Sequence, residues 1–182
     1  KAENSITLTP NTNITAAYGE EITLPTAEAK FGTPTCSHTI EELKEVGTYV
    51  VTWTVEGTDD YAGATATITV TIGKATPEVT APTAITGLVY TGSEHALINA
   101  GSTTGGTLEY SVDGGAWSTT VPTGTNAKVY TVSYRVVGND SYNDVEAKSI
   151  TVEIAKATNS ITLSSTDSIN VPYGTAVELP TA

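Results

Sequence analysis

Few residues of this chain have both the type and the spacing that catalysis needs. Cys36 and His38 lie two positions apart, so on a strand they could share a face as a nucleophile and its base. No third group that would orient the histidine is evident. His95 is the only other histidine, and neither histidine has a second His or Cys at a metal-ligand spacing. We expect a small buried cysteine, a surface histidine, no zinc site, no cofactor and no enzyme.

Two loops gather the oxygen ligands that calcium prefers. One contains Asp59 and Asp60, and the other contains Asp140 and Asp144 among asparagine and serine. Calcium takes six or more oxygens, and each loop alone supplies too few. Asn, Asp and Ser also occur in turns because they bond their own backbone. We therefore interpret both loops as turns, with a calcium site between modules as the weaker alternative.

Exposed aromatic side chains could stack on the rings of sugars. Trp53 lies at an inward position of a predicted strand, whereas Trp117 follows a predicted turn and is the better candidate for a glycan platform. Tyr61 and Tyr142 recur at the same place in two related stretches, which favours packing against the end of a domain.

The elements around these residues are predicted to be strands. Residues 49–55 and 67–72 alternate apolar and polar side chains, which is typical of strands with one buried face. Residues Leu108–Trp117 are predicted to form a hairpin, because Asp113-Gly114-Gly115 supplies residues that tolerate positive φ. Residues 39–46 alone have helix-forming character, and they are too few for more than one turn.

The strands belong to an internal repeat. Residues 1–27 and 156–182 align without a gap, with 14 of 27 positions identical. A second repeat relates residues 47–74 to 128–156, and Lys-Ala pairs begin at positions 1, 74 and 156. The sequence thus predicts two modules, residues 1–73 and 74–155, followed by the opening strands of a truncated third at residues 156–182.

The fold class is predicted to be all-β, with tandem immunoglobulin-like β-sandwich modules. Several short strands in each module, separated by turns, are typical of a sandwich. Glu45, Gly47, Tyr49 and Val51 fit a tyrosine corner, in which the tyrosine hydroxyl bonds backbone upstream. Tyr130 holds the same place in the second module. The predicted inward residues are listed here: Tyr49, Val51, Trp53, Val55, Ile68, Val70 and Ile72, then Tyr130, Val132, Tyr134, Val136, Ile150, Val152 and Ile154.

Composition narrows the possible partners. The formal net charge of −12 argues against nucleic acid, which requires a concentrated basic surface. No apolar run is long enough to span a membrane as a helix, so we expect no membrane insertion. Cys36 is the only cysteine, so the modules depend on apolar packing rather than on disulfides.

Four stretches resemble the tandem bacterial immunoglobulin-like repeats, of the Big or MBG type, found in secreted and cell-surface proteins, especially of gut bacteria. They are GTYVVTWTVEGTDDY at 47–61, LVYTGSEHAL at 88–97, LEYSVDGGAWS at 108–118 and VYTVSYRVVGNDSYN at 129–143. The resemblance implies an extracellular spacer and interaction module that serves adhesion and has no catalytic residues. Its partners would be neighbouring modules and an unknown protein or glycan. The alternative function is a carbohydrate-binding module.

The final segment needs a partner for its apolar face. Residues 156–182 carry apolar residues at the positions of the first module's opening strands, and two or three strands alone are marginal in water. We expect the segment to pack on the second module or a neighbouring molecule. The alternative is exchange, in which it replaces residues 1–27 of another copy.

Overall fold

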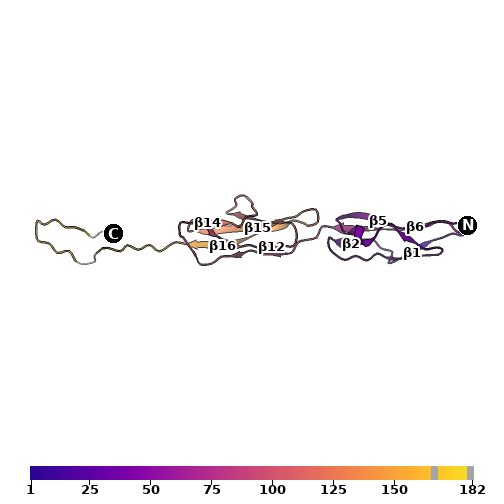
Figure 1. The fold of residues 1–182 in the computed structure, drawn as a ribbon, viewed down its shortest axis with the longest axis horizontal. Coiled ribbons are helices and arrows are strands. Elements are labelled where there is room, and N and C mark those ends of the chain that lie inside the picture. The colour runs from indigo at the N-terminus through magenta and orange to yellow at the C-terminus, as the bar shows by residue number, and fades with distance from the viewer. Residues whose placement is uncertain (165–167, 180–182) are drawn as a thin grey trace.

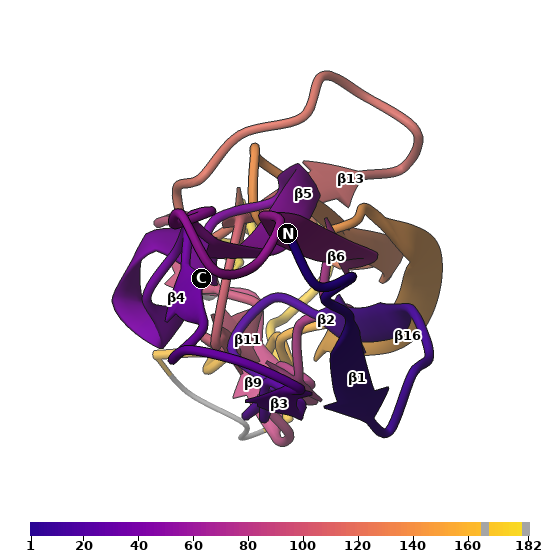
Figure 2. The same ribbon diagram turned by 90° about the vertical axis from the view of Figure 1, so that its right-hand side faces the viewer.

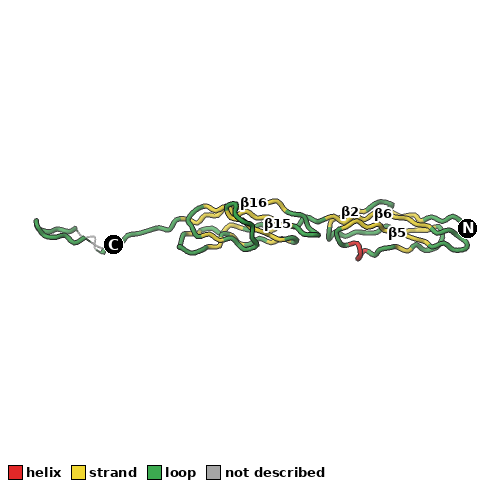
Figure 3. The backbone as a smooth tube through the Cα atoms, turned by 90° about the horizontal axis from the view of Figure 1, so that it is seen from above, coloured by secondary structure: helices red, strands yellow, loops and turns green. Residues whose placement is uncertain are grey.

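The computed structural model describes residues 1–164 and 168–179, and its fold is all-β. Two strand-rich segments, residues 1–73 and 74–155, follow one another along the long axis, and the tail after residue 155 leads away from the second (Figure 1). Within the described ranges the one helical element is the short 3-10 helix η1, Ile40–Leu43, as predicted for this stretch (Figure 3). Its Thr39 amide donates to Glu42 Oε2 at 2.8 Å, and this bond lowers the pKa of Glu42.

The first segment has one four-stranded sheet and one two-stranded sheet. In the larger sheet β5 pairs antiparallel with β6 and β4, and β2 runs parallel to β6, so the order is β2-β6-β5-β4. The smaller sheet is the antiparallel pair β1–β3. The strands are β1 (Ile6–Thr9), β2 (Ile14–Ala17), β3 (Thr26–Ala29), β4 (Thr35–Cys36), β5 (Gly47–Val55) and β6 (Ala64–Gly73).

The second segment repeats the larger sheet. Its order is β13-β15-β16-β9, in which β15 pairs antiparallel with both neighbours and β9 runs parallel to β16. Three short antiparallel pairs, β7–β12, β8–β11 and β10–β14, complete it. The strands are β7 (Val79–Thr80), β8 (Thr83–Ala84), β9 (Leu88–Val89), β10 (His95–Ala96), β11 (Ile98–Asn99), β12 (Ser102–Thr103), β13 (Thr107–Val112), β14 (Thr123–Gly124), β15 (Val129–Val137) and β16 (Val145–Ala155).

Each segment has its own apolar core between its sheets. In the first, Leu8 of β1 lies in one buried cluster with Val51 and Val70 of the larger sheet. In the second, Leu97 and Ile98 lie in one cluster with strands β13, β15 and β16. The predicted inward residues are buried in both segments, except for Tyr49 and Ile150, which are half-buried. Alternation predicts these positions correctly because neighbours on a strand point to opposite faces.

Both predicted tyrosine corners are present. The hydroxyl of Tyr49 donates to the carbonyl oxygen of Glu45 at 3.0 Å. The hydroxyl of Tyr130 donates to the carbonyl oxygen of Asn126, also at 3.0 Å. The second corner forms without the acidic residue and the glycine of the first, because the bond is made to backbone and depends on the tyrosine alone.

The predicted hairpin at Leu108–Trp117 is correct at its turn and wrong in its second arm. Asp113 and Gly114 have φ values of 50° and 75°, and the Gly115 amide donates to the Val112 carbonyl oxygen at 2.8 Å. Both central residues thus have the positive φ of a type I′ turn. Beyond the turn the second arm forms a single bridge, between Tyr110 and Ser118, on the edge of β13 that does not face β15. The following loop stands away from the body (Figure 2).

The described residues of the tail do not pack on the second segment, which was one of the two partners that we expected, and packing on a neighbouring molecule stays a prediction. Its described residues, 156–164 and 168–179, form no strand, and all are exposed. The tail does form the turn that follows β2 in the first segment. The Thr175 amide donates to the Pro172 carbonyl oxygen, as the Glu20 amide does to that of Ala17. The repeat therefore specifies local turn geometry, whereas strand pairing requires the remainder of a sheet.

Candidate functional site

The loop at 138–144, between β15 and β16, is fixed by its own polar side chains. The Asn139 carboxamide oxygen accepts from the amides of Ser141 and Tyr142, both at 2.9 Å. The Asp144 carboxylate accepts from the amide of Gly138 at 2.6 Å. Asparagine and aspartate bond nearby backbone in this way in turns. The loop is therefore ordered before it meets any partner.

This loop binds the linker between the two segments. The Ala75 amide donates to the Ser141 carbonyl oxygen at 3.0 Å, and the Asn143 amide donates to that of Ala75 at 2.8 Å. The Lys74 ammonium donates to the carbonyl oxygen of Asn139 at 2.7 Å. With the Asn143 carboxamide, which donates to the Lys74 carbonyl oxygen at 3.3 Å, three residues of the loop thus hold Lys74 and Ala75 directly after β6 ends.

One aromatic contact joins the two segments across this linker. Tyr18, which follows β2, meets Tyr142 of the loop with ring centroids 5.5 Å apart and planes inclined by 73°. Edge-to-face pairs of this geometry contribute about 0.5–1.5 kcal/mol beyond their buried area. We define the junction as Tyr18, Lys74, Ala75 and the loop at 138–144. At the junction a side chain of the first segment, Tyr18, contacts an ordered loop of the second. We take the junction as the candidate functional site.

The corresponding loop of the first segment, at 57–61, is built alike but carries a different neighbour. Ala2 exchanges backbone bonds with Asp60 and Ala62, as Ala75 does with Ser141 and Asn143. Phe31 stacks on Tyr61 at 5.6 Å. Cys36 pairs with Trp53 in the first segment, and Tyr110 pairs with the equivalent Tyr134 in the second. Five residues before each of them lie Phe31 and Gly105, which are therefore equivalent positions. A methyl group on Gly105 would collide with the ring of Tyr142, so glycine is required for that ring to lie on the backbone.

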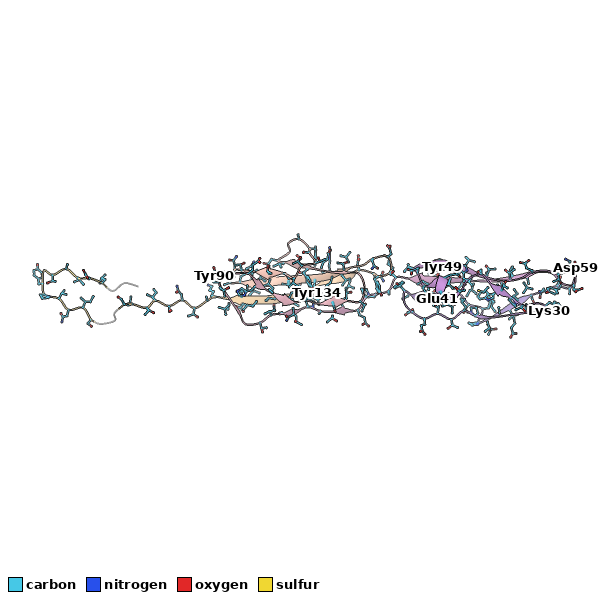
Figure 4. The ribbon with its side chains drawn as sticks, viewed as in Figure 1. Lys30, Glu41, Tyr49, Asp59, Tyr90 and Tyr134 are labelled. Carbon is cyan, nitrogen blue, oxygen red and sulfur yellow. The ribbon has the colours of Figure 1, made fainter. Side chains whose placement is uncertain are left out.

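The four calcium candidates lie in two separate loops. Asp59 is at the N-terminal end of the molecule (Figure 4), whereas Asp140 and Asp144 lie in the junction loop. The backbone carbonyl oxygen of Asp60 accepts a hydrogen bond from the Ala2 amide. The carboxylate of Asp144 accepts one from the Gly138 amide. Among the residues that the structure describes, no group of three or more His, Cys, Asp or Glu could hold a metal ion. Of the four carboxylates, that of Asp144 bonds a turn backbone, as our interpretation of the loop predicts.

The expectation of a buried Cys36 is wrong, because this cysteine is exposed. His38, which we expected at the surface, is half-buried. Cys36 is exposed because β4 has only two residues and lies at the edge of its sheet. The His38 ring nitrogen Nδ1 is 2.7 Å from Ser37 Oγ, and the His95 nitrogen Nε2 is 2.9 Å from Thr91 Oγ1. The structure gives no contact between Cys36 and His38.

Trp117 lies beside a shallow groove rather than in the core. The groove has a volume of about 340 Å³, and Arg135, Asp144 and Glu146 line it with the tryptophan. The Arg135 guanidinium lies 4.3 Å from the Trp117 ring centroid, and it also bonds the Glu109 carboxylate at 2.9 Å. One face of the ring is therefore already occupied by a cation.

A second groove lies at the end of the first segment and is lined in part by Tyr18. It has a volume of about 590 Å³, with Ile22, Leu43 and Ile72 among its apolar lining and glutamates around them. Glu20 is held by a turn, because its carboxylate accepts the Ala17 amide at 2.7 Å. The groove contains neither histidine nor cysteine, so it offers no nucleophile paired with a base.

Sequence reasoning found part of the junction and missed the rest. It placed Tyr61 and Tyr142 at domain ends and Lys74 at a module start. It missed Tyr18, although that tyrosine is conserved within the repeat as Tyr173. No helix in the described part of the chain is long and apolar enough to cross a membrane. Comparison of the chain with protein-family models and with curated proteins found no match.

Proposed function

We propose that the chain is a non-catalytic spacer and interaction protein, built from tandem immunoglobulin-like modules and exported to the bacterial surface or medium, where it serves adhesion. The junction carries this proposal. A spacer has to fix the orientation of consecutive modules, and the loop at 138–144 holds the linker by four hydrogen bonds while Tyr142 contacts Tyr18.

The immunoglobulin-like assignment has three supports. The two larger sheets have the same strand order and the same parallel edge pair. Each segment has a tyrosine corner next to its central antiparallel pair. Each core lies between sheets, as it does in a sandwich.

The test of the spacer is whether the segments are held in one orientation in solution. Residual dipolar couplings of the full chain should fit one alignment tensor for residues 1–155. Tyr142→Ala should separate the tensors of the two segments, because it removes the aromatic contact, while each segment stays folded. Tyr61→Ala is the matched control, since its loop lies at the other end of the first segment. Independent tensors in the unmodified chain would exclude a spacer role.

Export has its own test. Antibodies against the chain should label intact cells that produce the protein, or detect it in their medium. Labelling that requires permeabilised cells would contradict the extracellular assignment.

Glycan binding is the second candidate, favoured by the groove beside Trp117. Its carboxylates and guanidinium could bond sugar hydroxyls, and the exposed part of the indole could pack on a ring. It ranks second because Arg135 covers one face of the indole. A glycan-array screen of the full chain and of Trp117→Ala would decide it: binding that disappears in the variant supports a carbohydrate-binding module.

A further inference from the structure

Tyr90 of the second segment occupies the backbone position that Tyr18 has in the first. Tyr18 follows the parallel pair β2–β6, and its amide donates to the carbonyl oxygen of Gly73, the last residue of β6, at 2.8 Å. Tyr90 follows the parallel pair β9–β16, and its amide donates to the carbonyl oxygen of Ala155, the last residue of β16, at 2.9 Å. The two tyrosines are therefore equivalent by hydrogen bonding and by register.

The linker after each segment is also the same. Lys74-Ala75-Thr76 follows β6 directly, and Lys156-Ala157-Thr158 follows β16 directly. In the first case the loop at 138–144 bonds to both Lys74 and Ala75. Lys156 and Ala157 carry the same donors and acceptors, and both are exposed.

The aromatic half of this second site is open to solvent. Tyr18 is half-buried, whereas Tyr90 is 42% exposed and its neighbour Val89 is 46% exposed. Figure 4 shows Tyr90 at the end of the second segment from which the tail leaves. Val89 and Tyr90 thus lie beside the exposed residues Lys156 and Ala157. At the junction, the equivalent Tyr18 is covered by Tyr142, and the equivalent Lys74 and Ala75 are bonded by its loop.

We propose that Val89, Tyr90, Lys156 and Ala157 form a docking surface for another immunoglobulin-like module. The occupant carries a Gly-x-x-x-Tyr loop like residues 138–142, places its tyrosine edge against Tyr90, and bonds Lys156 and Ala157 through its loop backbone. The inference rests on the proposed spacer function and adds the partner and the contacts. Because the contact is small, it depends on the high effective concentration that a short covalent linker provides.

The test is the full chain with a second copy of residues 74–155 inserted after Ala155, ahead of the tail. This copy begins with Lys-Ala, as the tail does, and contains the complete loop. We expect the inserted copy to share one alignment tensor with the segment before it. We also expect ring–ring nuclear Overhauser effects between Tyr90 and the copy's equivalent of Tyr142. Tyr90→Ala should abolish the shared tensor and leave the melting temperatures of the segments unchanged.

The same substitution at the inserted copy's equivalent of Tyr90 is the matched control. Only the tail follows that tyrosine, so its loss should not change the alignment. The inference is wrong if the inserted copy reorients freely, if Tyr90→Ala leaves its orientation unchanged, or if the copy fails to fold when placed after Ala155. A first junction that stays rigid in those cases leaves the spacer function intact, whereas a first junction that is also flexible contradicts the spacer function itself.

Discussion

The hydroxyl of Tyr130 both donates to the carbonyl oxygen of Asn126, at 3.0 Å, and accepts from the amide of the same residue, at 2.9 Å. The hydroxyl of the equivalent Tyr49 donates to the carbonyl oxygen of Glu45, and this is its one hydrogen bond within the part of the chain that the structure describes. One residue thus satisfies both hydrogen-bonding capacities of the Tyr130 hydroxyl, and the second corner is tied more firmly than the first.

Tyr130→Phe should therefore destabilise its segment more than Tyr49→Phe does. A net hydrogen bond contributes about 0.5–1.5 kcal/mol, so we expect about 1 kcal/mol for Tyr49 and up to about 2–3 kcal/mol for Tyr130. Urea denaturation followed by amide signals from each segment measures both. Tyr90→Phe is the control at an exposed tyrosine. Equal losses at the two corners would show that the second bond contributes nothing.

Val51→Ala should cost about 1–3 kcal/mol of unfolding free energy through lost burial and a cavity, because its side chain is fully buried. Val50→Ala, one position away on the same strand, should change stability by less than about 0.5 kcal/mol, because its side chain is 60% exposed. Equilibrium denaturation of both variants tests the inward face. A larger loss of stability for the Val50 variant would mean that the opposite face of the strand is the buried one.

The ion pair between Asp113 and Lys128 should make stability depend on pH at the acidic end. The Lys128 ammonium, 2.6 Å from the carboxylate, and the Thr131 amide lower the pKa of Asp113. A lowered folded-state pKa stabilises the protein above the unfolded value of about 3.9, and this contribution disappears as the pH falls through the folded-state value.

Asp113→Asn should remove that part of the pH dependence. Asparagine tolerates the positive φ of 50° at this position, so the turn is retained. Denaturation between about pH 3 and pH 7 should give a flatter stability profile for the variant than for the unmodified chain. Asp59→Asn is the control in an exposed loop. Parallel profiles for the two chains would mean that the ion pair has no influence on folding.

Chelation should leave the fold unchanged. The Asp140 and Asp144 loop is fixed by bonds to its own backbone, so its geometry requires no cation. We expect equal melting temperatures in EDTA and in millimolar calcium. A fall of many degrees in EDTA would restore the calcium site at Asp59, Asp60, Asp140 and Asp144.

The sequence predicts the long strands well because their signal is local. Strands β5, β6 and β15 alternate over nine to ten residues, and the burial of Val51 and Val132 follows from that period. In β16 the alternation covers Ile150 to Ile154. Turn chemistry is equally local, which is why the Asp113-Gly114 turn was predicted.

The remaining features depend on what lies opposite a residue in space. The sequence pattern does not show that the strand of Cys36 has only two residues and lies at the edge of its sheet. The exposure of Cys36 was therefore not predicted. The arm after Gly115 resembles a strand, yet Trp117 packs on Arg135 instead. Tyr18 and Tyr142 are far apart in sequence, and the recurrence of Tyr18 as Tyr173 was the one signal that could have drawn attention to Tyr18.

The difference between Phe31 and Gly105 has a genetic consequence. A crossover that separates codon 105 from codon 142 would put phenylalanine beside Tyr142, where the ring now lies on a bare backbone. In such recombinants the ring of Tyr142 could no longer pack on the backbone at position 105. Any exchange between the two repeats would therefore have to carry residues 105 and 142 together.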